Sequence, residues 1–138
     1  MNVYVDSSVL LRVVLGEPGR LSIWPRITTP VASELIRLES LRTIDRARIR
    51  LGLGDAEVAE QRAAIFDLVD SFHLVALDGR VLERAAEPFP TTLGSLDAIH
   101  LASALLVRGR FQDLSLATHD QELAVAARAV GLRVLDGR

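Results

Sequence analysis

Short apolar runs alternate along this chain with longer segments of helical character, and this alternation constrains the fold more than any other feature. The apolar runs have the length and β-branched content of strands, and they fall at residues 2–5, 27–31, 72–77, 114–118 and 132–135. Helical segments are predicted at 7–15, 21–26, 32–51, 55–70, 78–87, 96–107 and 120–130. The order predicts an α/β protein with three layers, in which helices cover both faces of a central, mostly parallel sheet of four to five strands.

The length and composition fit one soluble domain spanning residues 1–138. A chain of 138 residues buries about two-thirds of its unfolded surface when it folds. The core must be aliphatic, because 49% of the residues are hydrophobic but only 4% are aromatic. No apolar run is long enough to cross a bilayer, and Asp6 interrupts the apolar start too early for a signal peptide. We therefore expect a cytoplasmic protein that does not associate with membranes.

The charged residues exclude several kinds of chemistry. All 16 basic residues are arginine, so Schiff-base chemistry and a P-loop lysine are excluded, and the absence of cysteine excludes thiolate chemistry. A net charge of -2 gives no overall attraction to nucleic acid, so a polyanionic substrate would need metal ions or a local arginine patch. Four arginines of one predicted helix could form this patch or simply a solvated helix face: Arg42, Arg46, Arg48 and Arg50.

Two acids stand directly at the ends of predicted strands. Asp6 follows the strand at 2–5, and Asp120 follows the strand at 114–118. The carboxyl ends of parallel strands share one edge of a sheet, where open α/β sheets bind ligands. Each acid could instead be the N-cap of the helix that follows. Asp78 also follows a strand, but it opens an exposed-looking helix and is interpreted as a cap.

Two further acids are harder to explain as local structure. Asp97 lies in the first turn of its helix, where the dipole favours an acid, yet Leu101 and Ala104 place it on an apolar row. Glu39 lies in mid-helix on a face with apolar residues one turn earlier. A buried carboxylate without a partner is too costly to be left unpaired. An ion pair with Arg42 would satisfy Glu39, and metal coordination is the competing explanation.

The four acids could converge at one edge of the sheet. Carboxylates without cysteine or a suitably spaced histidine pair favour Mg²⁺ or Mn²⁺ over zinc. A divalent cation relieves the repulsion between the acids and activates water for attack on a phosphate, which points to phosphoryl chemistry. Thr118 could hydrogen-bond a metal-bound water. His100, one turn after Asp97, is interpreted as a core or supporting group rather than as a general base. Ser95 is the predicted N-cap of that helix.

Four segments of the chain resemble the signature regions of PIN-domain proteins, above all the VapC toxins of bacterial toxin-antitoxin pairs. They are VYVDSSVLLR at 3–12, SELIRLESLR at 33–42, LGSLDAIHLASAL at 93–105 and LATHDQELAVAARAVGL at 116–132. The resemblance implies a PIN-like fold and a metal-dependent endoribonuclease that hydrolyses RNA, is usually homodimeric and is held inactive by a VapB-type antitoxin. Carried over by position, the acidic ligands and catalytic residues fall on Asp6, Glu39, Asp97 and Asp120, with Thr118 as the accompanying hydroxyl.

Two other functions are weighed against the nuclease. A catalytically inactive binding module could use the same fold, with the acids serving only as caps and ion pairs. A phosphotransfer domain of the receiver or haloacid-dehalogenase type also places an aspartate after its first strand, but both types depend on a lysine that this chain lacks. Residues 52–72 carry no signature and therefore indicate nothing about the substrate.

Overall fold

The computed structural model describes residues 1–19 and 21–137 and contains one five-stranded sheet. All neighbouring strands are parallel, and their order is β3-β2-β1-β4-β5. The strands are β1 (Asn2–Val5), β2 (Thr29–Ser33), β3 (His73–Val75), β4 (Ser115–Ala117) and β5 (Arg133–Leu135). The predicted α/β class is confirmed.

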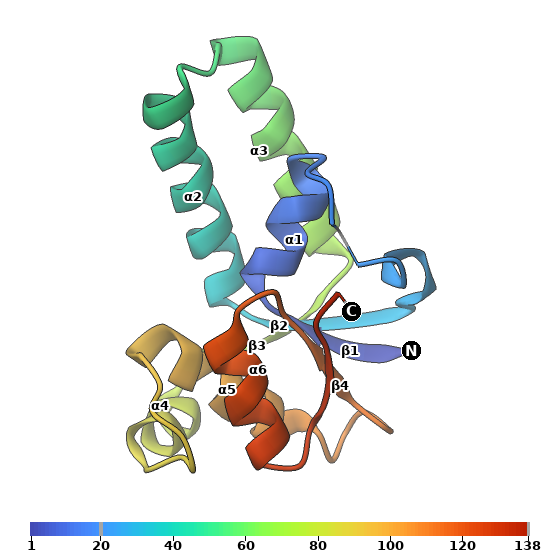
Figure 1. The fold of residues 1–138 in the computed structure, drawn as a ribbon, viewed down its shortest axis with the longest axis vertical. Helices are drawn as coiled ribbons and strands as arrows, with labels where there is room; N and C mark the ends of the chain where they lie inside the picture. Colours follow the sequence, from blue (N-terminus) through green and yellow to red (C-terminus); the bar gives the residue numbers. More distant parts are fainter. Residues whose placement is uncertain (20, 138) are drawn as a thin grey trace.

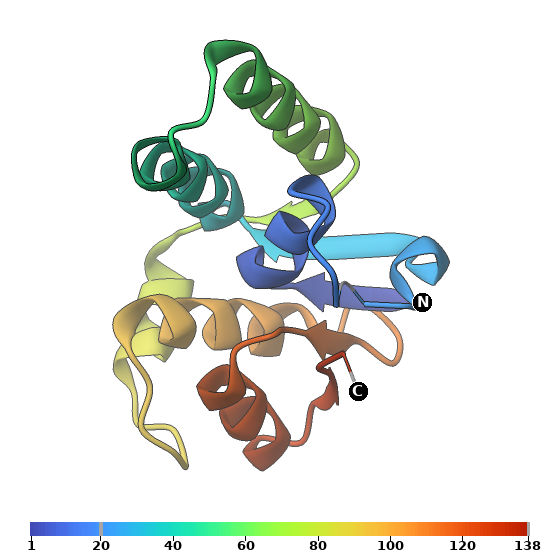
Figure 2. The same ribbon diagram turned by 45° about the horizontal axis from the view of Figure 1, so that its top comes forward.

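Helices cover both faces of the sheet, as Figures 1 and 2 show, so the three-layer α/β/α arrangement is also confirmed. One face carries α1 (Ser7–Val14), α2 (Leu35–Leu51) and α3 (Asp55–Asp70), and the other carries α4 (Gly79–Ala86), α5 (Ser95–Val107) and α6 (Gln121–Ala129). Within the described residues, every helix is too short or too polar to cross a bilayer.

Alternation along β1 divides the apolar core in two, because successive strand residues point to opposite faces of a sheet. Val3 and Val5 are fully buried in the cluster that includes Ile36 of α2. Tyr4, between them, is fully buried in the other cluster with Leu101 of α5. A polar hydroxyl therefore enters the core on the α5 side.

The boundary between β2 and α2 differs from the prediction of a strand at 27–31 and a helix from Ala32. The strand runs through Ser33, because Ala32 and Ser33 still pair with β3. The hydroxyl of Ser33 then accepts a hydrogen bond from the backbone N–H of Leu35 at 3.1 Å, which satisfies an amide in the first turn of α2. Continued strand pairing delays the helix by three residues.

Two other local predictions need correction. The segment 21–26 was expected to be a short helix, but within it only Trp24–Arg26 form a 3₁₀ turn. Ser95 is the first residue of α5 and not its cap, because Gly94 occupies the extended N-cap position. The remaining helices begin and end within two residues of the predicted bounds.

The order of the strands places a topological switch point between β1 and β4. The chain passes from β1 to β2 on one side, whereas β4 and β5 lie on the other side of β1. Parallel sheets bind ligands at the carboxyl ends of the strands at such a point. The backbone N–H of Asp6 donates to the carbonyl oxygen of Ala117 at 3.0 Å, so the ends of β1 and β4 are joined directly.

Candidate metal centre

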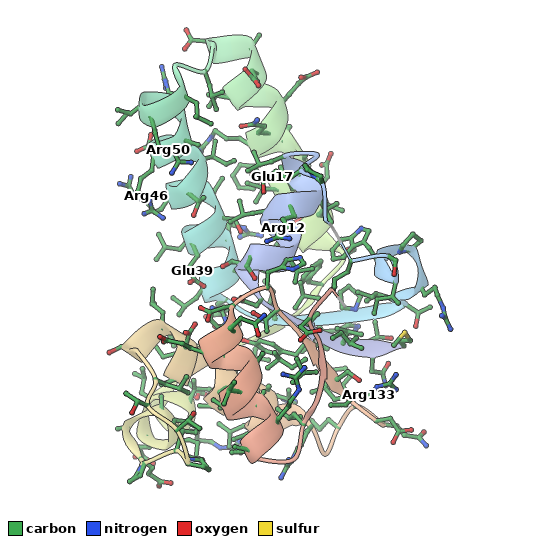
Figure 3. All side chains as sticks on the ribbon, in the orientation of Figure 1. Arg12, Glu17, Glu39, Arg46, Arg50 and Arg133 are labelled. Atoms are coloured by element: carbon green, nitrogen blue, oxygen red, sulfur yellow. The ribbon has the colours of Figure 1, made fainter. Side chains whose placement is uncertain are left out.

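The four acids singled out in the sequence line one pocket of about 510 Å³ at the carboxyl edge of the sheet. They come from four different elements: Asp6 from the end of β1, Glu39 from α2, Asp97 from the first turn of α5, and Asp120 from the end of β4. Figure 3 shows Glu39 on the part of α2 nearest the sheet. The fold therefore brings together residues that are more than 100 positions apart in the chain.

Asp6 is held by hydroxyl groups and does not cap α1. Its side chain is buried, with 5% of the residue exposed. Oδ2 accepts hydrogen bonds from Ser8 Oγ and Thr118 Oγ1, both at 2.8 Å. Although Asp6 occupies the N-cap position, its side chain bonds to no backbone amide of the helix, so the capping interpretation is wrong for this acid. The other oxygen, Oδ1, lies 3.9 Å from His100 Nε2.

Ser8 and Thr118 connect the two strand ends that carry Asp6 and Asp120. Thr118 is fully buried, and its hydroxyl accepts from the backbone N–H of Asp120 at 2.9 Å while donating to Asp6. The hydroxyl of Ser8 accepts from the backbone N–H of His119 at 3.0 Å while also donating to Asp6. Both hydroxyls therefore orient the carboxylate of Asp6 and fix it relative to the β4–α6 junction.

Asp120 combines two of the interpretations offered for it. Its Oδ1 accepts from the backbone N–H groups of Glu122 at 2.9 Å and Leu123 at 3.3 Å, so it does cap α6. The same residue lines the acidic pocket. Both capping bonds use Oδ1, so capping leaves the second oxygen of Asp120 unused. The side chain of Asp120 also hydrogen-bonds with that of Asp97 in the pocket.

Glu39 is paired with a histidine and not with the predicted Arg42. Its Oε1 lies 2.5 Å from His100 Nε2, and 18% of its side chain is exposed. Arg42 instead pairs with Asp45 at 3.0 Å on the surface of α2. The local ion pair expected from the sequence is therefore wrong, and the partner of Glu39 comes from a helix on the opposite face of the sheet.

His100 is the centre of a buried chain of hydrogen bonds that ends at Glu39. The backbone N–H of Ser33 donates to the Tyr4 hydroxyl oxygen at 3.1 Å, and this hydroxyl lies 2.8 Å from His100 Nδ1. Burial raises the pKa of Tyr4 well above its usual value, so the phenol keeps its proton. When His100 is neutral, Tyr4 donates to Nδ1 and Nε2–H donates to Glu39. His100 is thus a positioning residue, as the sequence analysis favoured.

The pKa values of two groups, Asp97 in the pocket and His100 behind it, are raised. Burial, followed by the negative charges of Asp120 and Asp6, raises the pKa of Asp97 to about 6. Burial lowers the pKa of His100, but the bond to Glu39 and the nearby carboxylates outweigh this effect and raise it overall. Repulsion between these crowded carboxylates makes them resist ionisation, and a divalent cation would relieve that repulsion.

The donor set of the pocket fits a hard divalent cation. In the described residues, no three histidine, aspartate or glutamate side chains already form a metal-ligand cluster. Mg²⁺, however, usually keeps several waters and is bound through one or two carboxylates, so it does not require such a cluster. The described wall of the pocket contains four carboxylates and no arginine or histidine side chain. Its chemistry therefore matches Mg²⁺ or Mn²⁺ better than zinc.

The arginines of α2 lie outside this pocket. Arg48 pairs with Asp55 at 2.9 Å, and Arg46 donates to the hydroxyl of Thr43 at 3.2 Å. Arg46 and Arg50 lie farther from the sheet than Glu39 along the same helix (Figure 3). Arg42, Arg46, Arg48 and Arg50 are exposed, and none of them lines the acidic pocket, so they form no patch at the acids themselves.

Fold and site define an α/β protein that gathers acids at the switch point of a parallel sheet. Residues 3–129 match the family model of the PIN domain, and the chain belongs to the PIN-domain family. It is 33% identical to Ribonuclease VapC46 of Mycobacterium tuberculosis over 137 residues, which cover 96% of this chain and 95% of that protein. It is 28% identical to Ribonuclease VapC47 of the same species over 136 residues, covering 94% and 92%.

Solved structures with similar folds include two toxin-antitoxin systems. A toxin-antitoxin complex from Klebsiella pneumoniae superposes with a TM-score of 0.69 at 15% identity, covering 100% of this chain and 98% of that one. VapBC2 from Rickettsia felis, bound to a DNA fragment from its promoter, gives a TM-score of 0.65 at 9% identity, covering 97% of each chain. At these identities the likeness shows the fold. The resemblance to PIN-domain proteins of the VapC type is confirmed.

The sequence analysis missed Tyr4 and the bridging role of Ser8. Tyr4 is the only tyrosine and lies between Val3 and Val5 on a buried strand. A hydroxyl at a core position needs a hydrogen-bond partner, and this requirement was the one available signal. The partner itself, 96 residues away, could not be identified from local pattern.

Proposed function

We propose that this chain is a single PIN domain acting as a Mg²⁺-dependent endoribonuclease toxin that hydrolyses RNA phosphodiester bonds, with Mn²⁺ able to replace Mg²⁺. The observation that carries the proposal is the pocket lined by four carboxylates from four elements. Capping explains Asp120, but it explains neither Asp6 nor Glu39. The ribonuclease names of the two Mycobacterium relatives support the same activity.

The acids would hold the cation through oxygens that the protein leaves available. These are Oδ1 of Asp6, the second oxygens of Glu39 and Asp120, and the carboxylate of Asp97. A bound Mg²⁺ polarises a phosphate oxygen and lowers the pKa of a coordinated water. Because the pKa of Asp97 is raised to about 6, cation binding near or below this pH would displace a proton from that carboxyl.

Other residues would act through these acids and not on the substrate. Ser8 and Thr118 fix one oxygen of Asp6, which leaves the other directed away from their hydroxyls. His100 fixes one oxygen of Glu39 in the same way. Such supporting hydrogen bonds hold metal-binding carboxylates in one orientation before the cation arrives.

Mapping RNA 5′ ends after expression in cells tests the proposal. The wild type should create new 5′ ends, and Asp6→Asn should create none, because it removes one negative oxygen from the pocket. Asp78→Asn is the matched control, since Asp78 also follows a strand but only caps α4 by accepting from Val81 N–H at 3.2 Å. New ends that persist in Asp6→Asn, with circular dichroism showing a folded protein, would refute the proposal.

We also propose a VapB-type antitoxin partner, a homodimer and a cytoplasmic location. The titles of the two structural neighbours, both toxin-antitoxin systems, support the antitoxin. The exposed leucines of β3, α4 and α5 are apolar side chains that an assembly could cover: Leu74, Leu82 and Leu96. Co-expression of this chain with a small DNA-binding protein encoded immediately upstream should give a complex that co-purifies.

The homodimer is tested by light scattering of the purified chain alone, which should give twice the mass of one chain.

A binding module without turnover is the second candidate. It is favoured by the lack of a preformed metal-ligand cluster in the described chain. Calorimetry with Mn²⁺ separates the two functions. A nuclease should bind Mn²⁺ and lose affinity in Glu39→Gln, whereas a module that uses its acids only as caps and pairs should bind none.

A further inference from the structure

A second cleft, of about 550 Å³, lies between α1, α2 and α3. It adjoins the acidic pocket, because Ser8, Leu11 and Asp120 line both. We propose that this cleft binds one unpaired base of the RNA substrate, that of a nucleotide next to the phosphodiester to be cut, and that it prefers guanine. The proposal rests on the nuclease function and adds the part of the substrate that the enzyme recognises.

The size and the walls of the cleft suit a flat heteroaromatic ring. Its volume lies within the range of about 300–1,000 Å³ that is typical of small-molecule pockets. Aliphatic side chains from α1, α2 and the following loop line it: Leu11, Leu15, Ala47, Leu51 and Leu53. In Figure 1, α2 and α3 extend beyond the sheet and α1 lies beside them. Proteins that read single-stranded RNA splay out its bases, stack them on aromatic side chains or arginine planes, and hydrogen-bond their edges.

The charged groups of the cleft match a base better than they match a phosphate. Arg12 and Arg50 supply donors, and Glu17 and Glu57 supply acceptors. Figure 3 shows Arg12 on α1, Glu17 in the loop that follows α1, and Arg50 on α2. Guanine presents two acceptors that suit a guanidinium and two N–H donors that suit a carboxylate. Uracil has one N–H donor, and a phosphate would be repelled by the glutamates.

Two polar atoms in the wall of the cleft lack partners. Gln61 Oε1 and His119 Nε2 are shielded from water, and in the described chain neither has a hydrogen-bond partner. An unsatisfied buried polar atom is destabilising, so a ligand that supplies a partner gains affinity. The terminal torsion of a glutamine rotates easily and can turn its amide toward a bound base. A base edge, which carries both donors and acceptors, can then bond to the turned amide of Gln61, whereas it would reach His119 Nε2 only after that ring had turned as well.

Binding of nucleoside 5′-monophosphates to the full chain in EDTA tests the proposal without any cleavage. The side-chain amide signals of Gln61 and the ring signals of His119 are followed by NMR as each of the four nucleotides is added. GMP should move both sets of signals and bind at least about tenfold more tightly than UMP, as expected for one bidentate base contact. Glu57→Gln should remove this preference. Glu60→Gln is the matched control, because Glu60 is exposed on the same helix but does not line the cleft.

Three results would overturn the inference. The first is equal affinity for the four nucleotides, and the second is binding that leaves the Gln61 and His119 signals unchanged. The third is a Glu57→Gln variant that keeps its nucleotide preference but no longer binds the antitoxin, which would make the cleft a protein-binding site. Because the nucleotide binding is measured without metal, guanine preference without RNA cleavage would contradict only the nuclease. Cleavage without any base preference would contradict only the cleft.

Discussion

Removing the hydroxyl of Tyr4 tests the chain of hydrogen bonds that supports Glu39. In Tyr4→Phe the aromatic ring stays in the core, but the Ser33 N–H and His100 Nδ1 lose their shared partner. Tyr4 and His100 are fully buried, as is Ser33, so water cannot replace the hydroxyl. A buried polar group left without a partner costs about 1–3 kcal/mol. Two such groups should lower the free energy of unfolding by about 2–6 kcal/mol.

Urea denaturation followed by circular dichroism measures this change. Ser40→Ala is the matched control, because Ser40 is also fully buried but its hydroxyl has no hydrogen-bond partner in the described chain. Its removal should change the free energy of unfolding by less than about 1 kcal/mol. A Tyr4→Phe variant no less stable than Ser40→Ala would refute the reasoning.

A double-mutant cycle with Glu39→Gln tests whether the chain behaves as a unit. Tyr4 and Glu39 do not share a bond, but both bond to His100. Residues of one network show coupling energies of about 0.5–3 kcal/mol. The two substitutions should therefore be less destabilising together than the sum of their separate effects. Strict additivity would mean that His100 does not transmit the effect of Tyr4 to Glu39.

Three further predictions concern the acids and their surroundings. The metal-free protein should lose about 1–2 kcal/mol of stability as the pH rises from 4 to 6, a value reduced for the partial exposure of Asp97. The native pKa of Asp97 is about 6 and its usual value is 3.8, so the native state binds more protons in this range. The pKa of His100 is raised from 6.5, so this histidine acts in the same direction only at higher pH. Asp97→Asn should flatten the curve, and an unchanged slope would exclude Asp97 as its source. Thr118→Val removes a hydrogen bond to Asp6 and should weaken Mn²⁺ binding by about 10–100-fold in calorimetry, an expectation contradicted by wild-type affinity. Arg42→Ala breaks only an exposed ion pair and should change stability by less than about 1 kcal/mol; a larger loss on thermal melting would show that Arg42 has a further structural role.

The positions of Asp6 and Asp120 could be predicted because local pattern determines them. Each follows a short apolar strand and precedes a helix, and parallel strands end at a common edge. The fold class follows from the same alternation, since each strand and helix can be recognised from its own period. The positions of residues at such junctions can therefore be predicted from the sequence, even when the order of the strands in the sheet is not known.

The environment of Glu39 could not be predicted, because it depends on long-range contacts. Glu39 and His100 are 61 positions apart, and only the docking of α5 against β2 brings them together. From the sequence alone, Arg42 was the nearest cation on the same face of the helix, but Asp45 pairs with this arginine. Glu57 and Gln61, proposed to read a base, fall within a segment that carries no motif.

The dependence of RNA cleavage on Mg²⁺ tests the central claim most directly. Single-turnover cleavage of a fluorescent RNA that contains a mapped site would be measured in EDTA and at increasing Mg²⁺, with the wild type, Asp6→Asn and Asp78→Asn. The acidic pocket predicts no cleavage in EDTA, saturable cleavage with Mg²⁺ for the wild type and Asp78→Asn, and a rate for Asp6→Asn that is lower by at least about 100-fold, the scale seen when one electrostatic contact to a transition state is removed. Cleavage in EDTA at the wild-type rate, or an Asp6→Asn variant as active as Asp78→Asn, would contradict it.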